Sequence, residues 1–447
     1  MSIDQDYGGG RGKDRSVTDF ASVDYFSDQA ISQDPYEYWE YLRTQGPVVR
    51  EPNHGVVAVV GYQEVLAAFK DHDSFSAVNA IGGPFPPLPF EPRGDDITEQ
   101  IEAHRHLFPI HEHLVVMDPP AHTRARSLLT KLLTPKRLKE NEDFMWQLVD
   151  NQIDQFIANR RCEFLAEYAK PFATSAIIDL LGVPEEDRPE FLAALGVEQR
   201  YGTQVGALDG APVGRDPLQY LDDKFAGYLA DRRRDPRDDV LSSMATAAYP
   251  DGSTPELIEV VKPATFLFAA GQETVTKLLS AAVQTLGDRP EFQQLLRDEP
   301  KRIPAFIEEA MRMHAPTKVD FRLVRKTATL GDMHLPAGTI VMLCLGAANR
   351  DPGKFDNPNE FRLDRKNVRE HLSFGRGIHS CAGAPLARVE GQITVRRLLD
   401  RMDDIRIDEA AHGPAGHRRY AYEPTFLLRG LTELHIEFTP KEPANAG

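Results

Sequence analysis

The chain has 447 residues, with 52 Lys or Arg against 68 Asp or Glu, so its formal net charge at pH 7 is −16. This balance argues against nucleic-acid binding, which needs a basic excess to neutralise phosphates. Three cysteines are too few for a disulfide framework and indicate a reducing compartment. There is no apolar run of the length that spans a membrane, and residues 1–16 lack the apolar core of a signal peptide. The composition therefore predicts a soluble, cytoplasmic protein.

The first hundred residues alternate between short helical and short extended patterns. Residues 1–17 are Gly-rich and polar, which predicts disorder. Asp34-Pro35 is expected to begin a helix with Asp34 as its N-cap. Val56–Val60 is a β-branched run that predicts a strand, and Tyr62–Phe69 has helical spacing.

Residues 80–95 contain five prolines among glycines and aromatic residues, which predicts a long loop. Long loops inside compact domains are often functional. Phe85, Leu88 and Phe90 in this loop either line a substrate site or pack on the core, and the sequence leaves both readings open.

The middle of the chain, Leu128–Leu296, is dominated by helical periodicity. It is interrupted at Gly202–Pro217, Arg232–Asp239 and Tyr249–Gly252. After Ala315-Pro316 short β-rich runs alternate with turns, at Ile340–Leu345 and Glu433–Phe438. There is no internal repeat and no separating linker, so the expected fold is mainly α with small β-sheets, in one large helix-rich domain over residues 18–447.

A constrained loop surrounds one cysteine: Phe374-x-x-Gly377-x-x-x-Cys381-x-Gly383. This pattern resembles the cysteine-ligated haem monooxygenases of the cytochrome P-450 family. The resemblance implies the P-450 fold, haem b as cofactor and Cys381 as the thiolate ligand of its iron. Gly377 and Gly383 would allow a tight turn and close backbone approach to the sulfur, and Phe374 would exclude water. Backbone N–H groups at the helix start after Cys381 would stabilise the negative sulfur.

The alternative for Cys381 is a buried structural cysteine in a glycine turn. That description fits Cys162 and Cys344, which lie in apolar surroundings without any motif. A hydrolase that uses Cys381 with a histidine base is a further alternative, but no second motif supports it, and His379 is only two residues away.

A second match lies upstream, in Ala270-Gly271-Gln272-Glu273-Thr274. It belongs to a long apolar helix that is expected to start near Thr254-Pro255-Glu256 and to bend or lose a backbone hydrogen bond at Pro263. In the family this segment crosses the distal face of the haem. A hydroxyl that bonds the carbonyl four residues earlier loosens a helix and makes room for dioxygen. The resemblance therefore implies that Ala270 and Gly271 provide space while Glu273 and Thr274 relay protons.

Glu309-Ala310-Met311-Arg312 matches the Glu-x-x-Arg of the family, in which the pair is buried and fixes the thiolate loop. We expect a structural role for both residues. The family commonly adds a third partner to this pair, often an Arg, at the position where this chain has Glu360. Either Arg362 or Arg365 is therefore expected to act as the third partner here.

Haem carries two propionates, which call for cationic donors. The resemblance supplies His122, Arg126, Arg322 and His379 for this role. His122 and Arg126 are four residues apart and would therefore face the same way on a helix.

The chain has no flavin, nicotinamide or iron–sulfur fingerprint of its own, so electrons must come from a separate partner. The resemblance implies an acidic ferredoxin or flavodoxin with its reductase, docking on a monomer of this chain. The predicted docking face combines Arg376 and Arg388 with the basic residues Arg124, Arg126, Lys131, Lys136, Arg137 and Lys139.

The segments that the resemblance assigns to the pocket are rich in Phe, Leu, Val and Ala, which predicts an apolar small-molecule substrate: terpenoid, steroid, fatty or aromatic. Asp320 either contacts a polar group of that substrate or is solvated. The predicted activity is hydroxylation with dioxygen. Alternatives are an enzyme that uses or rearranges a peroxide on the same haem, and a haem sensor without turnover.

Overall fold

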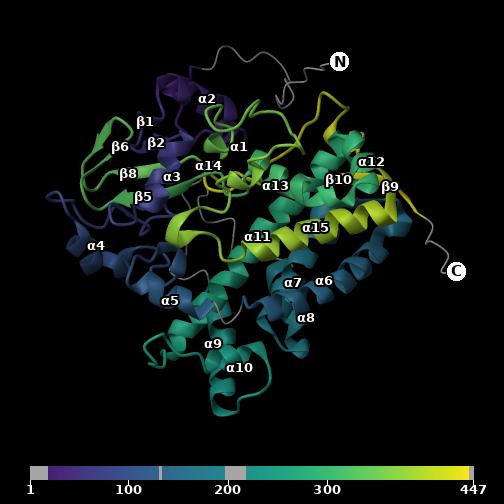
Figure 1. Ribbon diagram of the computed structural model, residues 1–447, viewed down its shortest axis with the longest axis horizontal. Helices are drawn as coiled ribbons and strands as arrows, with labels where there is room; N and C mark the ends of the chain where they lie inside the picture. Colours follow the sequence, from purple (N-terminus) through teal and green to yellow (C-terminus); the bar gives the residue numbers. More distant parts are fainter. Residues whose placement is uncertain (1–18, 130–132, 197–217, 442–447) are drawn as a thin grey trace.

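The computed structural model describes residues 19–129, 133–196 and 218–441. The segment 1–17 and the interruption at 202–217 lie outside these residues. Figure 1 shows two regions, a helical body and a smaller region of β-strands with a few short helices. The mainly α fold with small sheets that the sequence predicts is confirmed.

The helices up to residue 129 have at most ten residues, and the longest helix of the N-terminal half, α6, follows them. The helices of this half are α1 (Gln29–Gln33), α2 (Tyr36–Gln45), α3 (Tyr62–Lys70), α4 (Thr98–His104), α5 (Ala121–Leu129), α6 (Pro135–Phe156), α7 (Lys170–Leu181) and α8 (Arg188–Gly196). The remaining helices are α9 (Gln219–Arg234), α10 (Val240–Ala245), α11 (Leu257–Asp288), α12 (Pro290–Asp298), α13 (Ile303–His314), α14 (Leu345–Ala348), α15 (Ala384–Arg401) and α16 (Glu409–His412).

The strands form three small sheets. The largest has the order β1-β2-β8-β5-β3, from Val48–Arg50, Val57–Val59, Ile340–Leu343, Asp320–Val324 and Phe75–Ser76, with β2 and β8 parallel and the other pairs antiparallel. A second, antiparallel sheet has the order β4-β10-β9, from Arg161–Glu163, His435–Pro440 and Met402–Ile407. The third pairs β6 (Ala328–Leu330) with β7 (Met333–Leu335).

Helix α11 is the centre of the helical body and packs against α7, α9, α13 and α15. It begins after Glu256, within the predicted segment, and the carboxylates of Glu256 and Glu259 each accept a backbone N–H bond across the first turn. The helix continues through Pro263, which has no N–H to donate to the carbonyl of Glu259, so the predicted loss of one backbone hydrogen bond occurs without a break in the helix. Dense packing on both sides holds the chain helical there.

The start of α2 also differs from the prediction. Asp34 closes α1 instead of capping α2, and Pro35 is the N-cap, without any side-chain hydrogen bond. The following helix buries Tyr38, Trp39 and Leu42, so it turns an apolar, largely aromatic face to the core.

The proline-rich segment 80–95 contains no helix or strand, as predicted. Phe85 is 42% exposed and contacts Phe26 and Phe426, whereas Leu88 and Phe90 pack against a small separate cluster. These three residues thus pack away from the main cavity of the protein, whereas Ala80 and Ile81 of the same segment line that cavity.

Candidate functional site

A cavity of about 370 Å³ lies between the loop of Cys381 and helix α11. Ala270, Gly271 and Thr274 line it on the α11 side, and Cys381 lies opposite. Two predicted motifs that are 107 residues apart in the sequence therefore face one cavity. Its remaining walls are mainly apolar and include Ile81, Ile110, Leu114, Ile177, Phe266, Leu267, Val319, Leu427 and Leu428.

The loop before Cys381 folds back on itself through tight turns. Gly377 has φ +72°, and a side chain there would collide with the carbonyl oxygen of Phe69 in α3, so only glycine fits. Gly383 has an ordinary φ of −78° and is the N-cap of α15, and a Cβ would lie 3.9 Å from the sulfur of Cys381. Gly383 thus lies in the turn after Cys381 and approaches the sulfur closely with its backbone N–H, as predicted, but without a positive φ. Gly375, which the motif did not single out, has φ +62°.

The sulfur of Cys381 is open to the cavity but lies deep in the protein. Burial raises the pKa of its thiol, while backbone N–H bonds from Gly383 and Ala384 and the charge of Arg126 act in the opposite direction. The N–H groups at the start of α15 thus point at the sulfur as predicted. A metal cation at the sulfur would offset the remaining cost of burying a negative thiolate, because thiolate is the form that binds a metal.

The four predicted cationic residues converge beside Cys381. His122 and Arg126 lie on one face of α5, and the rings of His122 and His379 are 4.2 Å apart. Arg126 donates to the carbonyl of Ser380 at 2.6 Å. Both ring nitrogens of His122 and Nε2 of His379 are buried without a hydrogen-bond partner among the described residues. Arg322 also lines the cavity.

This donor set fits the propionates of haem. Unsatisfied buried nitrogens cost free energy, and an anionic ligand that accepts from them would recover it. Together with the sulfur on one side and apolar walls around it, the cavity has the donors and the surface that haem requires.

Protonation of His122 is expected to destabilise the protein when haem is absent. Burial, followed by the charge of Arg126, lowers the pKa of His122 to about 4 from its ordinary 6.5. The unfolded state therefore binds the proton first, and stability falls as pH decreases from about 6.5 toward 4. Between pH 7 and pH 5 the wild type should lose about 2 kcal/mol more than His122→Gln in urea unfolding. If the free energy of unfolding depended on pH equally in the two proteins, His122 would not be a buried imidazole with a lowered pKa.

Thr274 and Glu273 both line the cavity, as predicted. The Thr274 hydroxyl donates to the carbonyl of Ala270 at 2.8 Å. The carboxylate of Glu273 is bonded to Nζ of Lys277 at 3.0 Å, and Lys277 also donates to Glu423 at 2.7 Å. Burial lowers the pKa of Lys277, but Glu273 and Glu423 outweigh it and raise the pKa, so the lysine stays charged.

The sequence reading missed this ion-paired lysine. Lys277 lies four residues after Glu273, which is the spacing of a helical acid–base pair and could have revealed the first contact. Nothing local signals Glu423, which is 146 residues away. Asp320 also lines the cavity and bonds Arg322 at 2.8 Å, and burial raises its pKa. It is thus a partly buried, ion-paired acid at the cavity wall, where a polar group of a ligand could reach it.

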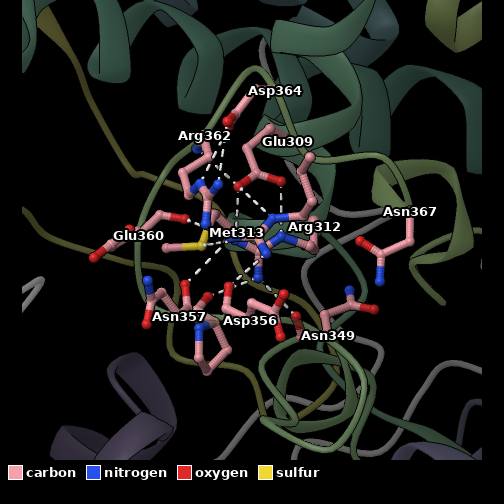
Figure 2. A network of polar contacts seen from close by, with 12 residues as sticks. Glu309, Arg312, Met313, Asn349, Asp356, Asn357, Glu360, Arg362, Asp364 and Asn367 are labelled. Carbon is pink, nitrogen blue, oxygen red and sulfur yellow. Dashed lines mark hydrogen bonds and ion pairs between the residues drawn. The ribbon is translucent and has the colours of Figure 1, made fainter.

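Glu309 and Arg312 form a completely buried bidentate pair, with both N–O distances at 2.7 Å (Figure 2). Of the two candidates for a third partner, Arg365 reaches Glu309 at 3.2 Å with its side chain. Arg362 contributes only its backbone N–H, and its guanidinium bonds the exposed Asp364.

Arg312 also ties down two segments of backbone. It donates to the carbonyls of Asn349, Pro358 and Glu360 at 2.7–3.0 Å, as Figure 2 shows. The side chain of Asn349 in turn bonds Ser373 at 2.8 Å, directly before Phe374. The pair therefore fixes the backbone that leads into the cysteine loop.

The predicted basic docking face is less free than its sequence indicates. Arg137 donates to the carbonyl of Leu180 at 3.1 Å and pairs with Asp179, and Arg388 pairs with Glu308 at 2.6 Å. Lys131 lies outside the described residues. The other paired members are Arg124 with Asp251, Lys136 with Glu140, and Lys139 with Glu142 and Asp143. Arg137 and Arg388 thus act inside the fold, which a count of charges cannot detect.

No helix among the described residues is both long and apolar enough to cross a bilayer. Cys162 and Cys344 are buried in the core, as predicted. Burial raises the pKa of both thiols, which keeps them protonated.

Comparison with known proteins agrees with this geometry. The family model for cytochrome P450 matches residues 218–403. The chain is 32% identical over 425 residues to cytochrome P450 144 of Mycobacterium tuberculosis, covering 92% of this chain and 90% of that protein. Among solved structures, it is 59% identical to substrate-free cytochrome P450 CYP150A6 of Mycobacterium marinum, with a TM-score of 0.89 over 95% of this chain and all of that one.

A more distant structure is CYP109E1 of Bacillus megaterium in complex with corticosterone, which is 25% identical with a TM-score of 0.75, over 92% of this chain and all of that one. The relatives cover nearly the whole chain, and the family motifs surround one cavity. The chain therefore belongs to the cytochrome P450 family of haem-containing monooxygenases.

Proposed function

We propose that this P450 hydroxylates an apolar small molecule with dioxygen, using haem b ligated by Cys381 and electrons from a separate ferredoxin or flavodoxin with its reductase. The observation that carries the proposal is the mainly apolar cavity that joins Cys381 to Gly271 and Thr274. A cavity of this kind binds ligands chiefly by removing apolar surface from water.

Bound haem supplies an iron centre whose thiolate ligand favours cleavage of the O–O bond. The chain would hold that group through the sulfur of Cys381 and through the nitrogens of His122, Arg126 and His379 at its carboxylates. Phe266 and Val319 would then orient the substrate and exclude water. Thr274 and Glu273 would hold and transfer protons at their side-chain oxygens.

The cavity lining supports a substrate with few polar groups. CYP109E1 has been solved with corticosterone and with testosterone, so a related cavity admits steroids. We extend this class, together with terpenoids and fatty or aromatic compounds, to the present chain. Asp320 at the cavity wall favours ligands with a hydroxyl donor among them.

The test is a spectroscopic screen followed by turnover. Apolar ligands of these classes are titrated against the haem-loaded protein, and those that displace water from the iron shift its spin state. Each such ligand is then incubated with NADPH, a ferredoxin and its reductase. Oxygen consumption that depends on the ligand and yields a hydroxylated product supports the proposal. Product formation with hydrogen peroxide alone, or spin shifts without any product, would favour the peroxide-using enzyme or the haem sensor.

Thr274→Ala is expected to separate oxygen consumption from product formation. Without the hydroxyl, proton delivery at this point fails, and formation of product should fall about 100-fold. Thr276→Ala is a matched control, because Thr276 makes the same bond to the carbonyl four residues earlier (3.0 Å) but does not line the cavity. Product and consumed oxygen are measured for both. Equal losses in the two variants would indicate a helix defect and not a role in proton transfer.

A further inference from the structure

Glu308, the acidic residue directly before the Glu309–Arg312 pair, occupies a buried position of its own on α13. Its side chain is 3% exposed. Its carboxylate bonds His371 at 3.0 Å and Arg388 at 2.6 and 3.2 Å, and Arg369 lies 3.8 Å away. Burial opposes its ionisation, but the bonds from His371 and Arg388 outweigh burial and lower its pKa to about 2. Glu308 is therefore a buried anion bonded to the guanidinium of Arg388 and to the ring of His371, whose own pKa is lowered by burial.

The two principal partners of Glu308 both contact Phe374. The guanidinium of Arg388, on the second turn of α15, lies 4.6 Å from the centre of the Phe374 ring. The ring of His371 lies 5.6 Å from that of Phe374. The Arg388 cation is attracted to the aromatic face and the His371 ring packs beside it, so Glu308 fixes the Phe374 ring indirectly by fixing these two groups.

Phe374 is in turn linked to the cysteine by the backbone. The N–H of Cys381 donates to the carbonyl of Phe374 at 2.8 Å, closing the loop that carries the sulfur. Nδ1 of His371 accepts from the N–H of Ser373 at 3.2 Å, so the same network also holds the residue before the ring. A displacement of Arg388 or His371 would therefore move the loop through the Phe374 ring, and a displacement of His371 would also move it through the backbone of Ser373.

We infer that Glu308 is a positioning residue that holds Phe374 against the Cys381 loop through Arg388 and His371, and thereby keeps the thiolate in place and sets its electrostatic surroundings. The inference rests on the proposed ligation of iron by Cys381. It also explains why Arg388 is turned inward: its charge stabilises the loop, and a docking partner would have to compete with Glu308 for it.

Glu308→Gln is the first test, performed on the haem-loaded protein. The reduced, carbon-monoxide-bound form should lose the red-shifted Soret band of thiolate ligation about tenfold faster than the wild type, because the ring and loop are less restrained. The reduction potential should move in the positive direction, because a negative charge near the site has been removed and the added electron is less strongly repelled.

Arg388→Lys provides a second test in case Glu308→Gln folds poorly. It keeps the charge at a half-exposed position but loses the planar fork that spans both carboxylate oxygens and stacks on the ring. It should also accelerate loss of the band. Arg369→Gln is the matched control, because Arg369 is 75% exposed and does not stack on Phe374, so band lifetime should not change.

A double-mutant cycle with Phe374→Ala separates positioning from a general loss of stability. If Glu308 acts through the ring, Glu308→Gln should add little to the rate of band loss in the Phe374→Ala background. Full additivity, or wild-type band lifetimes in both Glu308→Gln and Arg388→Lys, would overturn the inference. Absence of the red-shifted band from the wild type itself would instead overturn the ligation by Cys381.

Discussion

Replacement of Cys381 by Ser is expected to abolish monooxygenase turnover and to remove the red-shifted Soret band of the reduced, carbon-monoxide-bound protein. A neutral hydroxyl cannot supply the electron density that a thiolate gives to the iron. The N–H groups of Gly383 and Ala384, which offset the burial of a negative sulfur, would then face a group that carries no charge. The difference spectrum and the product yield are the measurements.

Cys344→Ala serves as the comparison for this result. Cys344 is buried, and burial raises the pKa of its thiol, so it has neither the access nor the charge of a ligand. This variant should keep the band, although a small cavity in the core will cost some stability. A red-shifted band that survives in Cys381→Ser would contradict the assignment of the ligand.

Arg312→Lys is expected to lower the free energy of unfolding by about 1–3 kcal/mol for each buried acceptor left without a donor, although the positive charge is kept. Lysine cannot reproduce the fork that spans Glu309 and also bonds the carbonyls of Asn349, Pro358 and Glu360. Urea unfolding measures the loss, and the haem content of the purified protein should fall with it, because these carbonyls fix the approach to the cysteine loop.

Arg362→Lys is the corresponding exposed substitution. Among the residues that the structure describes, its guanidinium bonds only Asp364, and the N–H that reaches Glu309 belongs to the backbone, which the substitution leaves unchanged. The effect on unfolding should stay within about 0.5 kcal/mol. A large loss here would mean that Arg362 shares the role that the structure gives to the Arg365 side chain.

Motifs with fixed local spacing were predictable from the sequence, and contacts between distant segments were not. The turn at Gly377 is fixed by its glycine, and the pairing of Glu309 with Arg312 by their spacing on one helix. By contrast, Arg362 and Arg365 differ only in the direction that the loop gives their side chains. The partners of Glu308, His371 and Arg388, are 63 and 80 residues away in the sequence, so no local pattern predicts these contacts.

Elements were predicted more reliably than their ends or their surroundings. Long helical periodicity identified α11. Its first residue depends on which side chains bond the free N–H groups of the first turn, and here these are Glu256 and Glu259. Apolar residues in the loop at 80–95 could either line a substrate site or pack elsewhere on the protein, and only tertiary packing decides between these positions. The same limit applies to Arg137, whose charge is evident in the sequence but whose acidic partner, Asp179, is not.

The contact of Lys277 with Glu423 has a consequence for attempts to change the ligand preference of this enzyme. Glu423 stands at the head of the same C-terminal turn whose Leu427 and Leu428 line the cavity. Grafting that turn from a relative would replace cavity walls and, in the same step, one of the two counter-ions of the lysine beside Glu273. A chimera that retains an acid at position 423 is needed to alter the shape of the cavity without altering the charge balance on α11.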